Sequence, residues 1–229
     1  MPLDGRSIVV VTGGTGFLGS AVCQRLLDAG AEVHVAWLHE EERDRFPHAD
    51  RCTMHQVELT DESAVEAFYG AFDAPWASIH IAGGFAMGPI DSMTLADFEA
   101  MHRMNTVTAF LCCREAVRSM RRGGNGGRIV NVGARPAVEP AGGMLAYTTS
   151  KAAVTSLTQC LAKEVLDDSI LVNAVLPSIM DTPANRAGMP DADFDAWPKV
   201  EEVAAAIEFL ASPDNALTTG TLLPVYGRA

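Results

Sequence analysis

Tyr147 and Lys151 are the two residues whose types and spacing most directly suggest chemistry. The sequence predicts a helix over residues 147–166, and positions i and i+4 of a helix lie on the same face. A phenol has an ordinary pKa of about 10, so it exchanges protons poorly at neutral pH. A neighbouring ammonium stabilises the phenolate and lowers that pKa, and the same lysine can bond ribose hydroxyls. The pair therefore suits acid–base chemistry, although such pairs also arise by chance on helix surfaces.

A glycine-rich segment, residues 12–19 (TGGTGFLG), lies between the first predicted strand and the first predicted helix. Gly13 allows a tight turn, Gly16 lets a pyrophosphate approach the backbone, and Gly19 lets the helix pack closely on the sheet. The free N–H groups at the start of the helix favour phosphate. This placement favours dinucleotide binding over a turn that serves packing alone. The predicted contacts to the dinucleotide in this segment are Thr12, Gly13, Thr15, Gly16, Phe17, Leu18 and Gly19.

The end of the second predicted strand leaves open which dinucleotide is bound. Folds that bind NAD place an acidic residue there for the ribose 2′-hydroxyl, and folds that bind NADP place a cation there. Trp37 and Leu38 occupy that point, and Glu58 and Leu59 follow the third strand as expected neighbours of the adenine. Three basic side chains nearby either reach a 2′-phosphate or lie in solvent: His39, Arg43 and Arg45. We expect NAD or NADP as the cofactor, with a slight preference for NAD.

The elements that must position these residues alternate between strands and helices along the chain. Short apolar runs predict strands at residues 7–12, 33–38, 53–59, 77–82, 128–132, 170–176 and 221–225. Helical spacing predicts helices at residues 17–29, 62–70, 95–122, 147–166 and 200–211. This alternation predicts one α/β domain over residues 1–229, with a doubly wound, mostly parallel seven-stranded sheet and helices on both faces. Ligands then bind at the carboxyl ends of the strands.

Charge and hydropathy exclude several classes of partner. The chain has 229 residues, of which 17 are basic and 29 acidic, and its formal net charge is −12. Nucleic acids and anionic membranes attract basic surfaces, so we expect neither as a partner. No uncharged apolar run approaches the roughly 18–20 residues that span a bilayer, and residues 1–6 lack the pattern of a signal peptide. We therefore expect a cytoplasmic protein.

The five cysteines and six histidines give no sign of a disulfide framework or a metal centre. The number of cysteines is odd and no C-x-x-C pair occurs, so we expect reduced thiols, most of them buried. No His, Asp or Glu cluster has the spacing of metal ligands, and we expect no metal. His80, on the fourth predicted strand, is expected to be a core residue with satisfied nitrogens. Four residues line either a flat apolar pocket or the core: Phe85, Met87, Met144 and Trp197.

Taken together, these residues resemble the short-chain dehydrogenase/reductase family over essentially the whole chain. The matching segments are residues 12–19, Ala82-Gly83-Gly84, Asn105, residues 147–151 (YTTSK), Pro177 with Thr182, and Thr219-Gly220. The resemblance implies a Rossmann fold, NAD or NADP as cofactor, and hydride transfer to or from a small-molecule substrate. It also implies a homodimer or homotetramer that packs through the helices at residues 95–122 and 147–166.

The resemblance also implies roles for individual residues. Tyr147 would donate or accept the substrate proton, and Lys151 would orient the ribose and tune Tyr147. Asn105 would position a proton-relay water, the alternative being an amide on the helix surface. Thr182 would hold the carboxamide of the nicotinamide. The expected cofactor-binding set is completed by Ala82, Gly83, Gly84 and Pro177.

Some residues depart from the family pattern. The family has a serine thirteen residues before the tyrosine, where it bonds the substrate carbonyl, and this chain has Ala134 there. Either the chain is a non-catalytic dinucleotide-binding or regulatory protein, or its substrate does not need that bond. Residues 181–197 are similar to the corresponding stretch of quinonoid dihydropteridine reductase, a short-chain relative that also lacks the serine, which favours the second alternative. The glycine spacing resembles that of longer epimerase-type relatives, which suggests an epimerase or dehydratase as a third alternative.

We therefore predict an NAD(P)-dependent oxidoreductase of the short-chain type. It would transfer a hydride between the nicotinamide and a small, planar or carbonyl/quinonoid substrate, as a dihydropteridine reductase does. The substrate site would be formed by the loops after the strands, including residues 181–198, which are proline-rich and irregular or shortly helical.

Overall fold

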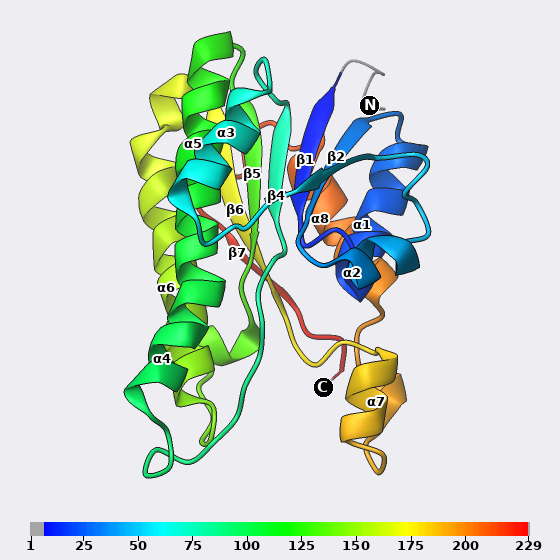
Figure 1. The fold of residues 1–229 in the computed structure, drawn as a ribbon, viewed down its shortest axis with the longest axis vertical. Helices are drawn as coiled ribbons and strands as arrows, with labels where there is room; N and C mark the ends of the chain where they lie inside the picture. Colours follow the sequence, from blue (N-terminus) through cyan, green and yellow to red (C-terminus); the bar gives the residue numbers. More distant parts are fainter. Residues whose placement is uncertain (1–6, 229) are drawn as a thin grey trace.

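Residues 7–228 are described by the computed structural model, and their strands form one seven-stranded parallel sheet. The strand order is β3-β2-β1-β4-β5-β6-β7 (Figure 1). The strands are β1 (Ile8–Thr12), β2 (Glu32–Trp37), β3 (Thr53–Gln56), β4 (Ala77–His80), β5 (Gly127–Val132), β6 (Ile170–Pro177) and β7 (Leu222–Val225). This order confirms the predicted doubly wound α/β fold. The absence of a signal peptide, expected for residues 1–6, lies outside the described residues.

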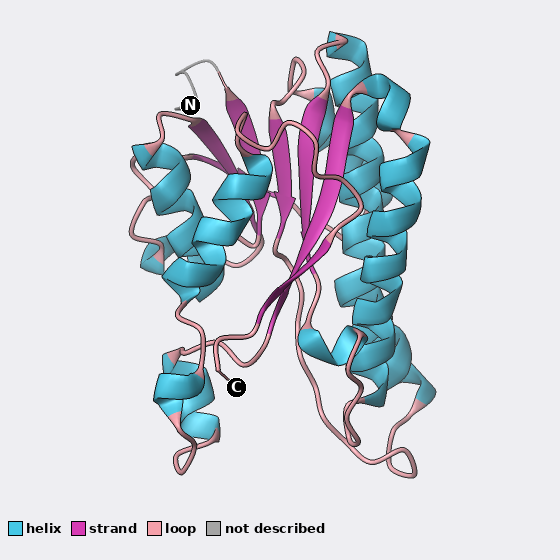
Figure 2. Cartoon of the chain, turned by 180° about the vertical axis from the view of Figure 1, so that it is seen from behind, coloured by secondary structure: helices cyan, strands magenta, loops and turns pink. Residues whose placement is uncertain are grey.

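Helices cover both faces of the sheet, as Figure 2 shows from behind. They are α1 (Phe17–Asp28), α2 (Glu40–Arg45), α3 (Glu62–Gly70), α4 (Leu95–His102), α5 (Thr108–Gly123), α6 (Leu145–Glu164), α7 (Pro183–Gly188) and α8 (Val200–Ala211). Successive side chains of a strand point to opposite faces. Val9 and Val11 of β1 therefore pack in one core with α1 and α8, whereas Val10 packs in a second core with α3, α5 and α6.

The long helix predicted over residues 95–122 is interrupted. A π-helical segment, Arg103–Val107, separates α4 from α5, so the expectation of one regular α-helix is wrong. Such a segment adds a residue to one turn and often lies at a functional site. It contains Asn105, whose side chain is buried at the carboxyl end of the sheet.

Two predicted strands are shorter in the structure. β3 ends at Gln56, three residues before the predicted end, because Glu58 and Thr60 form a turn in which the Glu58 carboxylate accepts both the N–H and the hydroxyl of Thr60. β4 ends at His80 and releases residues 81–84 as an extended loop. The charged run at residues 40–45 is helix α2 and buries none of its residues.

Residues 181–198 form a small unit beyond the carboxyl ends of the strands (Figure 1). They contain α7 and the 3₁₀ turn Phe194–Ala196, as the expected irregular or short helical structure. The Asp181 carboxylate accepts hydrogen bonds from Arg186 at 2.5 and 2.8 Å and from Lys199 at 2.6 Å. These bonds tie the start of the unit to its own helix and to the residue that precedes α8.

β7 pairs only with β6 and lies at the edge of the sheet. Pro224 cannot donate a backbone hydrogen bond, and an edge strand tolerates that loss. Within residues 7–228, no helix combines the length and the apolar character needed to cross a membrane.

Candidate active site

The glycine-rich segment follows β1 directly and makes a turn that side chains would block. Gly13 has a φ of +68°, and a Cβ built on it would lie 2.6 Å from the backbone nitrogen of Ala82. A Cβ on Gly19 would collide with the carbonyl oxygen of Gly13. These contacts confirm the predicted tight turn at Gly13 and the close packing at Gly19.

Gly14 and Gly16 show that packing explains only part of the glycine pattern. A Cβ on Gly14 would lie 2.7 Å from Val35, so packing requires a glycine at this position, which the sequence did not single out among its neighbours. A Cβ on Gly16 would make only an ordinary contact, 3.5 Å from the carbonyl oxygen of Gly13. The protein's own atoms therefore leave room for a side chain at Gly16, and approach of a ligand is a reason for the glycine there.

The start of α1 has the electrostatics of an anion site. Its N-cap, Gly16, makes no side-chain cap, and its first turn contains no acidic residue. The first N–H groups of a helix lack partners within the helix and carry partial positive charge. The glycine turn and the start of α1 thus fit the pyrophosphate of a dinucleotide.

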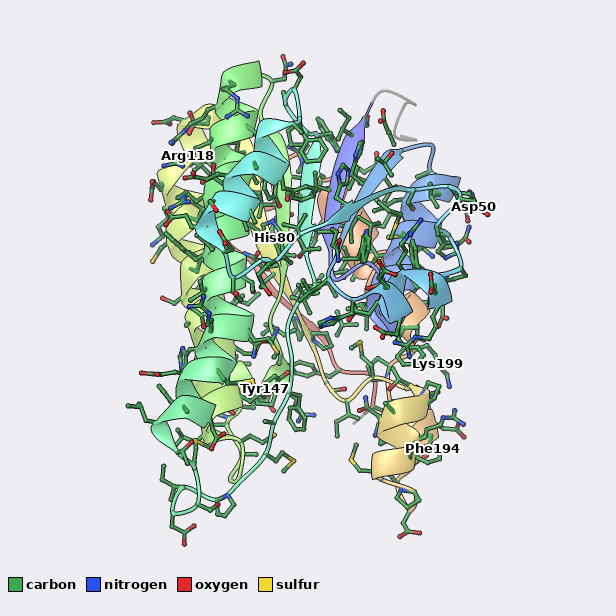
Figure 3. The ribbon with its side chains drawn as sticks, viewed as in Figure 1. Asp50, His80, Arg118, Tyr147, Phe194 and Lys199 are labelled. Atoms are coloured by element: carbon green, nitrogen blue, oxygen red, sulfur yellow. The ribbon has the colours of Figure 1, made fainter. Side chains whose placement is uncertain are left out.

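Tyr147 and Lys151 lie in the first two turns of α6. Figure 3 shows Tyr147 near the carboxyl ends of the strands. The ring of Phe85 contacts the Tyr147 ring edge to face, with centroids 4.8 Å apart. Lys151 is buried and its Nζ donates to the carbonyl oxygen of Val132 at 2.8 Å. Tyr147 and Lys151 lie on one helix with the predicted spacing. The hydrogen bond from Lys151 to Val132 was not predicted.

Burial governs the proton affinities of this pair. It raises the pKa of Tyr147 to about 12 and lowers the pKa of Lys151 to about 8. The lowered tyrosine pKa expected from the lysine is therefore wrong for the protein by itself. Desolvation disfavours both charged forms, and the Lys151 ammonium is bonded to Val132.

Asn105 is a central residue of the site, and the alternative of a helix-surface amide is wrong. Its side chain is 1% exposed. The amide exchanges two hydrogen bonds with the backbone of Gly84, accepting from the N–H at 2.9 Å and donating to the carbonyl at 3.1 Å. It also donates to the Ser150 hydroxyl at 3.0 Å and to Met101 Sδ at 3.1 Å. The amide thus joins the loop after β4 to the helix that contains Tyr147.

The loop after β4 approaches these side chains through its glycines. A Cβ built on Gly83 would lie 2.5 Å from Asn105 Oδ1 and 3.2 Å from Lys151 Nζ. A Cβ on Gly84 would collide with Met104 Sδ. The structure therefore brings together the predicted residues Gly83, Gly84, Asn105 and Lys151.

Ser150 is a site residue that the sequence analysis missed. It lies beside Lys151, is fully buried, and its hydroxyl accepts from Asn105 while donating to the Tyr147 carbonyl at 2.8 Å. Its place within residues 147–151 was an available signal. Ala134, at the position where the family has a serine, is buried with 4% exposure, and an alanine side chain carries no hydroxyl.

The predicted adenosine end lies beside the carboxyl end of β2. Trp37 is buried, its indole N–H has no hydrogen-bond partner among residues 7–228, and the Arg43 guanidinium lies 5.7 Å from its ring centroid. The Leu38 carbonyl accepts from Gln56 at 3.1 Å. Glu58 uses its carboxylate within its own turn.

Pro177 and Thr182 lie at and just after the carboxyl end of β6. Pro177 is the last residue of β6. Thr182 is 5% exposed, and its hydroxyl accepts the N–H of Asn185 at 3.2 Å as the N-cap of α7. The threonine hydroxyl therefore has a local role in starting α7.

His80 is buried within the sheet, as predicted. Its Nδ1 contacts Asn131 Oδ1 at 2.8 Å and its Nε2 contacts the Ser78 hydroxyl at 2.8 Å. Burial lowers its pKa to about 4, so the ring is neutral near pH 7. Among residues 7–228, no three His, Cys, Asp or Glu side chains are grouped to hold a metal ion.

Comparison with known sequences decides the family. The pattern of the short chain dehydrogenase family matches residues 7–192. The chain belongs to the short chain dehydrogenase family. The family membership predicted from the residues is confirmed, as is the prediction of an oxidoreductase of this type.

Relatives of this short chain dehydrogenase match it over nearly its whole length. The 2,3-dihydroxy-2,3-dihydro-p-cumate dehydrogenase of Pseudomonas putida is 29% identical over 248 residues, which cover 99% of this chain and 95% of the relative. The 4-formylbenzenesulfonate dehydrogenase of Comamonas testosteroni is 30% identical over 245 residues, which cover 97% of each.

Solved structures agree in fold. The acetoin dehydrogenase from Enterobacter cloacae has a TM-score of 0.86 and 26% identity, and the match covers 96% of this chain and 94% of that one. ElxO with NADP bound has a TM-score of 0.88 and 25% identity, covering 96% and 97%. This short chain dehydrogenase is thus similar along almost all of its length to proteins described as dehydrogenases.

Proposed function

We propose that this protein is an NAD(P)-dependent oxidoreductase that uses Tyr147 as its acid–base residue. The observation that carries the proposal is the convergence of Gly83, Asn105 and Lys151 beside Tyr147. These residues lie at the carboxyl ends of the strands, where the glycine turn also lies. A dinucleotide fits this edge, because Gly13 and Gly19 make the turn and Gly16 leaves space for a ligand. ElxO, which is similar over 97% of its length, is described with NADP bound.

The bound nicotinamide would supply or accept the hydride. Tyr147 Oη would donate the proton in the direction of reduction and accept it in the direction of oxidation. Lys151 would bind the ribose hydroxyls with its Nζ, exchanging its bond to Val132 for bonds to the ligand. Asn105 would hold the loop at Gly83 and Gly84 at the correct distance from α6.

The substrate would be small and planar or quinonoid. Ala134 offers no hydroxyl to a substrate carbonyl, so the substrate must react without that donor. The exposed ring of Phe85 lies against Tyr147 and offers an aromatic surface beside the acid. The similarity of residues 181–197 to quinonoid dihydropteridine reductase supports the same class, because a quinonoid ring is already electrophilic.

The remaining parts of the proposal concern organisation. Residues 1–229 would form one NAD(P)-binding domain, with the substrate site made by the loops after the strands, including residues 181–198. The protein would be a cytoplasmic homodimer or homotetramer without nucleic-acid or membrane partners. The net charge of −12 supports the proposal that neither nucleic acids nor membranes are partners. The five free cysteines support the proposed cytoplasmic location.

Turnover measurements test the proposal directly. Purified protein is assayed with NADH and NADPH against quinonoid pterin, diketone and quinone panels. We expect oxidation of one cofactor, and Tyr147→Phe should lower kcat by about 10²–10⁴-fold, the usual contribution of a general acid. Tyr69→Phe removes a hydroxyl buried in the core against Ser78 and serves as a matched control for loss of a phenol. Absence of turnover in all panels, or full activity of Tyr147→Phe, would refute the enzymatic assignment.

A further inference from the structure

The carboxyl end of β2 holds a cation whose function the fold does not explain. Helix α2 lies beside the glycine turn, because Thr15 Oγ1 donates to the Glu42 carboxylate at 3.5 Å. Residues of α2 are therefore next to the segment that would bind the pyrophosphate. This contact places α2 near the part of a dinucleotide that carries the adenosine ribose.

The three basic side chains near this strand end differ in what they contact. Arg45 Nε donates to the carbonyl oxygen of Glu41 at 2.8 Å, within its own helix. His39 is the N-cap residue of α2 and makes no side-chain cap. Arg43 instead lies over the Trp37 ring, with its guanidinium carbon 5.7 Å from the centroid. Only Arg43 of the three is thus held against the last residue of β2.

Arg43 has no anionic partner within residues 7–228. Most arginines of the described chain pair with a carboxylate, as Arg25 does with Glu208 and Arg51 with Asp28. The Arg43 guanidinium has only the face of Trp37, an attraction worth about 0.5–1 kcal/mol at exposed sites. A guanidinium held in place but without an anion can bind a phosphate through two N–H groups at once.

Trp37, the last residue of β2, has no side-chain acceptor for a ribose hydroxyl. A carboxylate at the position of Trp37 would accept the 2′-hydroxyl of NAD, whereas an indole can only donate. The Trp37 indole N–H is buried, and none of residues 7–228 accepts a hydrogen bond from it. The acidic side chain of Glu42 lies near the glycine turn, where its carboxylate accepts a hydrogen bond from the Thr15 hydroxyl.

We infer that Arg43 is the residue that recognises the 2′-phosphate of NADP(H), with the Trp37 ring as the platform that holds its guanidinium. The inference rests on the proposed function and replaces the slight preference for NAD drawn from the sequence. Glu42 acts in the opposite direction, since its carboxylate repels the same phosphate. The cofactor preference is then set from α2 and not by a charged residue on β2 itself.

Binding of nucleotide fragments tests this assignment without turnover. Calorimetric titration compares 2′,5′-ADP with 5′-AMP, and fluorescence titration compares NADPH with NADH. We expect the wild type to bind the 2′-phosphorylated member of each pair at least about tenfold more tightly, because the 2′-phosphate adds one charge-assisted pair with Arg43. Arg43→Gln should remove most of that difference and leave 5′-AMP and NADH binding within about twofold. Arg45→Gln, two residues away on the same helix, is the matched control and should change neither.

A second variant keeps the test decisive if Arg43→Gln does not fold. Glu42→Gln removes the opposing charge and should strengthen 2′,5′-ADP binding with little effect on 5′-AMP. Equal affinity for the two members of each pair in the wild type would overturn the inference while leaving the proposed function intact. An equal loss of all four ligands in Arg43→Gln would overturn it too. Binding of none of them would refute the proposed function itself, and the inference with it.

Discussion

Lys151 is a buried cation whose proton affinity makes folding depend on pH. Burial lowers its pKa from 10.5 to about 8. Below pH 8 the amine is charged in both the folded and the unfolded chain, and its burial costs free energy. Between pH 8 and 10.5 the folded chain releases the proton while the unfolded chain keeps it, so this residue's contribution to stability rises with pH.

This linkage predicts the behaviour of Lys151→Met. The free energy of unfolding of the wild type should rise relative to that of the variant between pH 8 and 10.5, by up to about 3 kcal/mol. Urea titrations at intervals across this range measure the difference. Lys163→Met removes an exposed lysine of the same helix and should show no such trend. A constant difference between wild type and Lys151→Met would show that the lysine is solvated.

Gly13 is a second residue at which a single substitution has a clear cost. Gly13→Ala places a Cβ in the left-handed region at φ +68° and 2.6 Å from the Ala82 backbone. We expect a loss of about 1–3 kcal/mol in stability, with a greater loss in dinucleotide affinity because the turn must shift. Thermal unfolding and NADPH titration measure the two effects. Gly142→Ala is the control, since nothing lies within 4 Å of its added Cβ, and a wild-type affinity in Gly13→Ala would contradict the role of the turn.

At the scale of residues, spacing predicted the chemistry but not the contacts. The i, i+4 relation of Tyr147 and Lys151 is a local property and is readable from sequence. The bond of Lys151 to Val132 joins residues 19 apart, and that of Asn105 to Ser150 joins residues 45 apart. Such pairs depend on how helices and strands meet, so local pattern does not determine them. The prediction of a lowered pKa for Tyr147 was wrong for the same reason: burial raises this pKa, and burial is a property of the fold.

Among the elements, the unit at residues 181–198 is held together by the ion pairs of a single carboxylate, that of Asp181. Asp181 is largely buried at its side chain and accepts from both Arg186 and Lys199. These two cations hold the pKa of Asp181 far below its usual range. Arg186 also stacks on Phe194, at 4.8 Å from the ring centroid. The aspartate thus connects α7, the 3₁₀ turn and the start of α8.

Asp181→Asn should loosen this unit without unfolding the sheet. The amide keeps the shape but loses the negative charge that strengthens the three hydrogen bonds from Arg186 and Lys199. We expect trypsin to cleave after Arg186 several-fold faster than in the wild type, while far-UV circular dichroism is unchanged. Asp191→Asn changes an exposed carboxylate of the same segment and should leave the cleavage rate as it was. Equal rates for Asp181→Asn and the wild type would contradict this role.

Element positions were readable from the sequence where apolar patterns were strong. β1, β6 and α8 lie where their apolar runs predicted them, within one residue at each end. The π-helical segment was missed because a single inserted residue interrupts the apolar spacing of a long helix only locally. Asn105, within this segment, accepts a hydrogen bond from the backbone N–H of Gly84, a contact between residues 21 apart. The early ends of β3 and β4 were also missed, since each is set by the turn or loop that follows.

At the scale of the whole molecule, the sheet edges and outer helix faces decide how copies of the chain would meet. α5, which belongs to the helices that the family resemblance assigns to assembly, carries Phe110 on its surface, and this residue is 46% exposed. Large exposed apolar side chains on a helix favour burial against a partner, at roughly 25 cal/mol for each Å² covered. The proposed homodimer or homotetramer would bury this ring in a packed helical interface.

Phe110→Glu therefore provides the test of assembly. A carboxylate at the centre of an apolar contact costs several kcal/mol to desolvate, so the variant should lose its partners and run at the mass of one chain in light scattering at micromolar concentration. Phe209→Glu changes a similarly exposed phenylalanine, 48% exposed on α8 over the opposite face of the sheet, and should keep the wild-type mass. Because binding of a partner stabilises the folded state, the Phe110→Glu monomer should also unfold at a lower temperature. A wild type that is monomeric, or a Phe110→Glu variant with unchanged mass, would show that these helices face solvent in the native protein.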